Sequence, residues 1–369
     1  MAQSLIQGNG PAAPGALARP KGPHRGRLLL ALARNLLTPL VAILVALGAS
    51  ALILLAAGYN PLAALAAMWR GAFGDMRTVT EVLIKATPLI LIASGLAVAF
   101  RCSIWNIGAE GQFYVGAVAS TATGIYLGGL PAPVLVPLVL IAGATGGALW
   151  GALAGWLKVR FNASEIVTTI MLNYIAIIGT SYLVTGPMIE AVGKYPQTAK
   201  ISPAAVLPRI LPPSRLHLGF LLALLAALVL YILLFKTSTG YAIRAVGINA
   251  EAARYAGMNV PANMVAAMAI SGGTAGLAGG VELAGIALRL YQQISPGFGY
   301  DGIAVALLAN NNPLGVIFSG ILFGALRSGS EMMQITAHIP SVLVFAIQGL
   351  IILAVVAFGV YRARPGREA

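Results

Sequence analysis

Long runs of apolar residues, separated by short polar stretches, occupy most of the chain. A helical run of about 18 residues or more can cross the roughly 30 Å hydrocarbon core of a membrane. Runs of this length lie at residues 36–58, 82–100, 105–127, 132–157, 166–185, 218–235, 262–287 and 341–361. The pattern predicts an all-α polytopic integral membrane protein.

One further apolar region is interrupted. Residues 302–309 form a run too short to cross, and the polar break at residues 310–313 separates it from the apolar run 314–326. We interpret this region as a broken pair, either a re-entrant hairpin or two short tilted spans. The expected total is then about ten membrane segments.

Composition supports this class. Of the 369 residues, 59% are hydrophobic and 9% charged, with a mean hydropathy of +0.88. So few charges cannot cover a water-facing surface, because soluble domains carry about 25% charged residues. A soluble enzyme, a disordered regulator and a secreted disulfide scaffold are therefore excluded, and the single Cys102 cannot form an internal disulfide.

The net charge of +13 fits cytoplasmic loops better than nucleic-acid binding, because Lys and Arg collect on the inner side of membrane proteins. Residues 1–35 are basic, free of acids and rich in Pro and Gly, which predicts a disordered cytoplasmic tail rather than a signal peptide. Basic residues on the same side of the predicted spans are Lys158, Arg160, Lys236, Arg244, Arg254, Arg362, Arg364 and Arg367. We expect both termini, including a tail at residues 362–369, to be cytoplasmic and residues 186–217 to form an external loop.

No pattern of enzyme chemistry is present. The three histidines, His24, His217 and His338, lie in a tail and near segment ends, without the partner spacing of a metal site or a catalytic triad. The nearest approach to a phosphate loop, at Lys194, lacks the upstream glycine spacing and the following Ser or Thr. We expect a chain that is not an enzyme and binds no metal or cofactor.

Glycines recur every fourth residue in two of the runs. Spacing of this kind places small residues on one helix face, where they allow two helices to approach closely. The two sets are Gly143, Gly147, Gly151 and Gly155, and Gly272, Gly276 and Gly280. We interpret them as helix-packing faces rather than as a cofactor loop.

Polar residues inside apolar runs are costly in lipid and usually face a bundle interior or a solute path. Three such clusters occur, and one of them is a stripe of Glu165, Thr169 and Asn173 at helical spacing. The candidate path residues are Asn106, Glu110, Gln112, Asn173, Tyr174, Asp301 and Asn310. For any one of them interhelical hydrogen bonding is an equal alternative, but for the clusters together a pathway is favoured.

Three stretches carry a family resemblance. They read Trp105-Asn-Ile-Gly-Ala-Glu-Gly-Gln112, Ser164-Glu-Ile-Val-Thr-Thr-Ile-Met-Leu-Asn-Tyr174 and Gly299-Tyr-Asp-Gly-Ile-Ala-Val-Ala-Leu-Leu308. They resemble the permease subunits of bacterial ABC importers for nucleosides and simple sugars, in particular the branch that works with BmpA-type nucleoside-binding lipoproteins. The resemblance covers residues 36–361, which it identifies as a transmembrane permease domain.

The resemblance implies import of nucleosides or related ribose-bearing solutes across the bacterial inner membrane by alternating access. A simple-sugar permease is the alternative, and an ion-coupled secondary carrier is a more distant one. The implied partners are cytoplasmic ABC ATPase subunits, a second, unlike permease and an external binding lipoprotein, besides membrane lipid. ATP and Mg would be bound by the partner ATPases, with no cofactor on this chain.

The resemblance also gives a role to residues 236–261. Glu251-Ala252-Ala253 followed by Gly257 looks like the signature of the coupling helix that rests in a groove of the ATPase. An Ala-rich helix, surface charges and a terminating glycine suit that role. The expected coupling residues are Arg244, Asn249, Glu251, Arg254 and Gly257. An amphipathic helix lying on anionic headgroups is the alternative.

A nucleoside offers hydroxyls and a flat base, which suit amides, hydroxyls and an aromatic ring. Asn106, Gln112, Asn173 and Tyr174 supply these groups. Glu110 is the acid of this set, and it either faces the solute or bonds backbone amides freed where the helix is broken.

Overall fold

The structure is a computed structural model that describes residues 45, 48–191, 195–340, 342–347, 349–350 and 353–354. The predicted tails at 1–35 and 362–369 lie outside the described residues. About half of the first predicted run and about half of the last lie outside them as well. Within the described residues the regular structure is helical, apart from two isolated β-bridges.

Most of the α-helices follow the apolar runs. Their bounds are α2 Pro61–Phe73, α3 Met76–Arg101, α4 Ala109–Tyr126, α5 Ala132–Phe161, α6 Glu165–Thr185, η1 Pro203–Ala205, α7 Gly219–Lys236, α8 Ser238–Ile248, α9 Ala250–Tyr255, α10 Val260–Glu282, η2 Leu283–Ala287, α11 Phe298–Leu308 and α12 Pro313–Thr336. Among the described residues, six helices are long and apolar enough to cross a membrane: α3, α5, α6, α7, α10 with η2, and α12. The predicted all-α, multi-pass membrane architecture is confirmed at this level.

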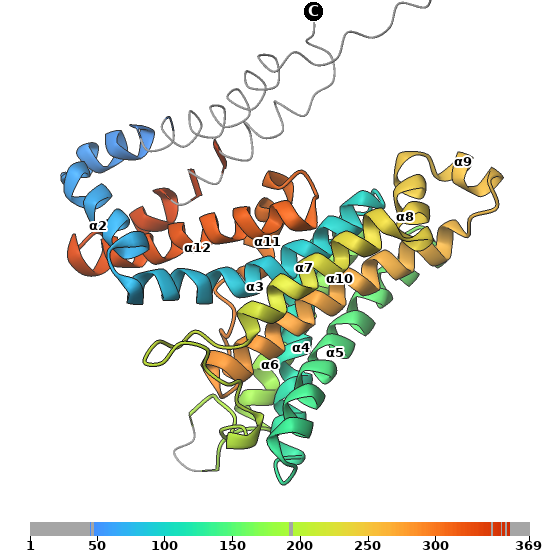
Figure 1. Cartoon of the computed structure of the whole chain (residues 1–369), viewed down its shortest axis with the longest axis horizontal. Helices are drawn as coiled ribbons and strands as arrows, with labels where there is room; N and C mark the ends of the chain where they lie inside the picture. Colours follow the sequence, from blue (N-terminus) through green and yellow to red (C-terminus); the bar gives the residue numbers. More distant parts are fainter. Residues whose placement is uncertain are drawn as a thin grey trace, which may run out of the picture.

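The long helices lie side by side in one bundle (Figure 1). Helix α10 is central, because it packs against α3, α4 and α5, while α12 packs against α2 and α3. Helices α8 and α9 project from one end of the bundle, and the loop between α6 and α7 lies at the other end (Figure 1). The two loops assigned to opposite sides of the membrane are therefore at opposite ends of the bundle.

The two glycine sets meet in the contact between α5 and α10. Gly143, Gly147, Gly151 and Gly155 are all buried. A Cβ atom on Gly147 would lie 2.6 Å from the Cα of Gly276 and closer still to the carbonyl oxygen of Gly272. Only glycine permits this approach of two backbones, so the helix-packing interpretation is confirmed.

The interrupted region consists of one short and one long helix. Helix α11 has 11 residues, and α12 has 24 and continues well past the apolar run that predicted it. The helix continues because its charged residues are paired: Arg327 with Asp301, and Glu331 with Lys85. Helix α12 is therefore long enough to cross a membrane, so the prediction of two short spans is wrong for this helix.

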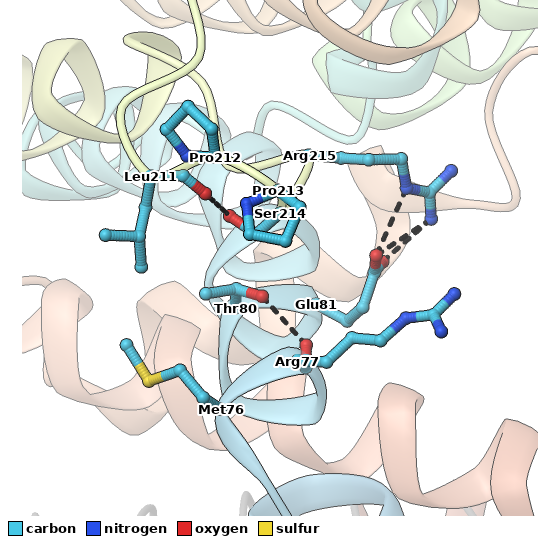
Figure 2. Close-up of a pocket in the computed structure, with 9 residues that line it drawn as sticks. All are labelled: Met76, Arg77, Thr80, Glu81, Leu211, Pro212, Pro213, Ser214 and Arg215. Atoms are coloured by element: carbon cyan, nitrogen blue, oxygen red, sulfur yellow. Dashed lines mark hydrogen bonds and ion pairs between the residues drawn. The ribbon is translucent and has the colours of Figure 1, made fainter.

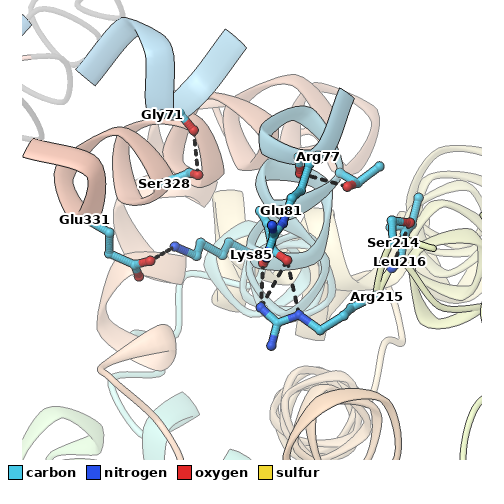
Figure 3. A network of polar contacts seen from close by, with 10 residues as sticks. Gly71, Arg77, Glu81, Lys85, Ser214, Arg215, Leu216, Ser328 and Glu331 are labelled. Carbon is cyan, nitrogen blue, oxygen red and sulfur yellow. Dashed lines mark hydrogen bonds and ion pairs between the residues drawn. The ribbon is translucent and has the colours of Figure 1, made fainter. Parts of the chain in front are cut away.

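Helix α2 was not predicted from the apolar pattern. The Asn60 side chain caps it by accepting hydrogen bonds from the backbone N–H groups of Leu62 and Ala63. Its small residues face α12, where the Ser328 hydroxyl donates to the carbonyl oxygen of Gly71 at 2.7 Å (Figure 3). With 13 residues it is too short to register as a membrane-spanning run.

Candidate functional site

The segment between α3 and α4 is held by a small network of buried amides. The Asn106 side-chain nitrogen donates to the Gln112 side-chain oxygen and to the Ser271 hydroxyl, both at 2.9 Å. Gln112 in turn donates to the Asn106 oxygen at 3.1 Å, and that oxygen also accepts from the N–H of Gly108. Asn106 and Gln112 are thus brought together, and their amides bond to protein groups.

Asn173 ties α6 to the start of α4. Its side-chain oxygen accepts from the N–H of Gly111 at 2.7 Å, and its nitrogen donates to the carbonyl oxygen of Ile107 at 2.9 Å. The same nitrogen lies 3.5 Å from the Tyr300 hydroxyl. Tyr174, the next residue on α6, is 58% exposed and lies within electrostatic range of Tyr300.

The Glu110 carboxylate bonds to the beginning of α11. Its Oε2 atom accepts from the N–H of Gly299 at 2.6 Å, and the side chain is buried. The Ser295 hydroxyl accepts from the N–H groups of Gly297 and Phe298 at the same helix end. An acidic group at a helix N-terminus satisfies free N–H groups and interacts favourably with the helix dipole. This is the backbone-bonding role, one of the two expected for Glu110.

Asp301 and Arg327 form an ion pair one turn further along α11. The guanidinium Nη2 atom lies 3.1 Å from the Asp301 Oδ2 atom, and it also donates to the carbonyl oxygen of Pro296 at 2.7 Å. The guanidinium is 4.5 Å from the centre of the Phe298 ring. Arg327 was not among the predicted path residues, because the apolar run ends one residue before it. An arginine next to an apolar run is nevertheless a sequence signal of a functional site in the membrane.

Asn310 lies apart from this cluster, at the other end of α11. Asn310 and Asn311 both have left-handed backbones, with φ of 51° and 53°, in the turn that joins α11 to α12. Their carbonyl oxygens accept hydrogen bonds from Arg101, and Asn312 caps α12. The dense asparagine run thus has a local structural explanation, because asparagine tolerates these backbone angles.

The expected coupling residues lie on α8, on α9 and at the ends of α9. Asn249 caps α9 by accepting from the N–H of Ala252, and Gly257, with φ of +81°, lies just past its end. Glu251 and Arg254 are exposed on α9. The Arg244 guanidinium instead lies over the Phe235 ring, 5.2 Å from its centre, so it anchors α8 to α7.

A pocket of about 640 Å³ opens at the end of the bundle opposite α8 and α9 (Figure 2). Its walls are the first turns of α3 and the segment 211–215 before α7. Arg215 closes one side by binding Glu81 through two nitrogens, at 2.9 to 3.1 Å (Figure 2). Lys85, one turn along α3, binds Glu331 of α12 (Figure 3). The pattern of apolar residues did not predict this pocket, because the residues that line the pocket lie at the ends of the membrane spans.

The family model and the relatives that match this chain are all described as transport permeases, but they name different solutes. A family model described as "Branched-chain amino acid transport system / permease component" matches residues 78–356. The guanosine ABC transporter permease protein NupP of Bacillus subtilis is 41% identical over 327 residues, covering 87% of this chain and 93% of the relative. The nucleoside ABC transporter permease protein NupB of Lactococcus lactis is 32% identical, with 91% and 95% covered. The glucose ABC transporter permease protein TsgB13 of Haloferax volcanii is 34% identical, with 86% of each chain covered. No solved structure matches the chain.

Proposed function

Because the chain belongs to the family of branched-chain amino acid transport system permease components, we propose that it is the transmembrane subunit of an ABC importer for nucleosides or related ribose-bearing solutes. The main support for nucleosides as the solute class is the 41% identity to a guanosine permease over 87% of the chain. The chain is a transport component rather than an enzyme, as its relatives are. A simple-sugar importer is the second candidate, favoured by the 34% identity to a glucose permease.

We place the protein in the bacterial inner membrane with about ten segments and both termini in the cytoplasm. Six apolar helices and the opposite positions of α8–α9 and the α6–α7 loop support this topology. The end with α8 and α9 is then cytoplasmic, and the 640 Å³ pocket opens to the outside. The domain boundaries expected from the sequence, with tails at 1–35 and 362–369, belong to the same proposal.

We place the solute path beside the start of α11. A short helix that begins inside a bundle is the arrangement that transporters use at a central site. Tyr174, Tyr300 and Asp301 offer aromatic and polar groups to a solute there, while Asn106, Gln112 and Asn173 shape the path through their bonds to backbone and to each other. Asn310 would lie at its cytoplasmic end.

The partners in this proposal are cytoplasmic ABC ATPases, a second and unlike permease, and an external binding lipoprotein. ATP and Mg are bound by the ATPases, and this chain binds no cofactor. Helix α9, with its exposed Glu251 and Arg254, is the element that transmits ATPase closure to the path. Opposite charges on the ATPase groove would then set its docking.

Reversing the charge of Arg254 to Glu, or of Glu251 to Arg, is expected to separate ATP hydrolysis from transport. Both side chains are exposed outside the bundle, so the protein should insert and assemble normally. Arg160→Glu is a matched control, because Arg160 is exposed at the end of α5 and outside the coupling loop. The measurement is solute uptake per ATP hydrolysed in the assembled complex. If uptake per ATP is the same in both variants as in the control, α9 lies on lipid headgroups instead.

Uptake by cells that express the complete transporter tests the solute class. With this chain present, labelled guanosine should accumulate, and unlabelled nucleosides should compete far better than glucose. A chain-free strain with the same partners is the control. Accumulation of glucose with no effect of nucleosides would replace the proposal by the sugar importer.

A further inference from the structure

Glu282 is an acidic side chain at the end of a membrane-spanning helix without a bonded partner. It is the last residue of α10, and its carboxyl group makes no hydrogen bond or ion pair with any residue that the structure describes. Other acids of the spans are bonded, as Glu81 is to Arg215 and Asp301 is to Arg327. Because an unpaired carboxyl group in a bundle is costly, its presence points to a partner that the chain does not supply.

The backbone next to Glu282 has an unusual form. Leu283–Ala287 is a π-helical turn, and it ends at Leu288 with a left-handed φ of 57°. Such turns are rare and occur frequently at functional sites. Glu282 is surrounded by neighbouring helices, but part of its surface stays exposed at this point. The carboxyl group is therefore accessible to a small molecule.

Glu282 lies between the two polar regions described above. It interacts electrostatically with Arg215, on the wall of the external pocket, and with Arg327, in the cluster at the start of α11. Tyr291, in the loop after the π-helical turn, is within electrostatic range of Glu282 as well. A solute that moves from the pocket toward α11 would meet this carboxyl group on the way.

We propose that Glu282 binds the neighbouring hydroxyl groups of the solute's sugar ring. The inference rests on the proposed function and names the part of the solute that this residue contacts. A carboxylate has two acceptor oxygens, which can receive hydrogen bonds from two adjacent O–H groups, such as those at the 2′ and 3′ positions of ribose. Nucleosides and simple sugars differ in the base but share such hydroxyls, so one carboxylate suits both candidate solute classes.

The test compares a ribonucleoside with its 2′,3′-dideoxy analogue in proteoliposomes that hold the complete transporter and its binding protein. We expect the wild-type complex to import the ribonucleoside at least about tenfold faster, because two hydrogen bonds of roughly 1 kcal/mol each are lost with the analogue. Glu282→Gln keeps one acceptor oxygen, so one hydrogen bond of roughly 1 kcal/mol remains, and the preference should fall to about fivefold. Glu282→Asp, which keeps the carboxylate, should retain more of the preference than Glu282→Gln.

Glu331→Gln is the matched control, since Glu331 is a mostly exposed acid paired with Lys85. The binding protein contributes equally in all variants, so a change in the preference reports this chain alone. The same preference in Glu282→Gln as in the wild type would overturn the inference. If Glu282→Gln does not assemble, equal import of the two solutes by the wild type would overturn it. Failure of the wild type to import any nucleoside would instead count against the proposed function.

Discussion

Replacing Gly276 with valine is expected to lower the yield of folded, membrane-inserted protein by at least about tenfold, because overpacking a tight contact costs about 1–3 kcal/mol and occasionally more. Gly276 is the point where α10 meets both α5 and α4. A Cβ atom there would lie 2.7 Å from the Cα of Gly147 and closer still to the carbonyl oxygen of Gly143. Gly116 of α4 approaches the same residue. These neighbours are backbone atoms, so no side chain can rotate away to make room.

The yield of monodisperse protein after detergent extraction is the measurement. Gly179→Val is the matched control, because Gly179 is also within a spanning helix but has no atom within 4 Å of an added Cβ. Valine should be tolerated there. Equal yields from the two variants would show that the α5–α10 contact is not what holds the bundle together.

Replacing Arg327 with methionine is expected to abolish uptake and to destabilise the complex by about 3–5 kcal/mol, the usual cost of breaking a buried ion pair. Methionine preserves much of the volume but leaves the Asp301 carboxylate without its cation. It also removes the hydrogen bond to Pro296 that holds the loop before α11. Thermal unfolding of the purified complex, with uptake measured in parallel, gives both effects.

The double variant Arg327→Met with Asp301→Asn separates the loss of stability from the loss of uptake. Because it removes both charges, stability should recover toward the wild-type value, while uptake should stay low if Asp301 belongs to the solute path. Equal stability in the single and double variants would mean that the Asp301 carboxylate is not buried against Arg327 in the native protein.

The features predicted best from the sequence are those set by local pattern. The apolar runs predicted the spanning helices because length and hydropathy suffice to define them. The glycines at every fourth residue predicted two helix-packing faces, and the structure shows that these faces pack against each other. Helix α12 was underestimated because an apolar count stops at Arg327, whereas the structure pairs that arginine with Asp301. Glu282 was not among the predicted path residues, although it is an acidic residue inside the apolar run 262–287.

Bonding partners far apart in the chain could not be predicted. Glu110 and Gly299 are separated by 189 positions, and Asn106 and Ser271 by 165. A single sequence shows that each residue is polar and costly in lipid, but it does not show which backbone or side chain satisfies it. The structure brings Glu110, Asn173 and Asp301 near the start of α11 and leaves Asn310 at the other end of that helix. The sequence alone did not give this grouping, and the solute path stays a prediction.

Transport by purified components tests the central claim most directly. Proteoliposomes containing this chain, its partner permease, the ATPases and the binding protein would be loaded with ATP and Mg and supplied with labelled guanosine, without an ion gradient. The account predicts guanosine accumulation that requires ATP hydrolysis and stops when this chain is omitted. Accumulation driven by an ion gradient in vesicles that contain this chain but no ATPase would contradict it.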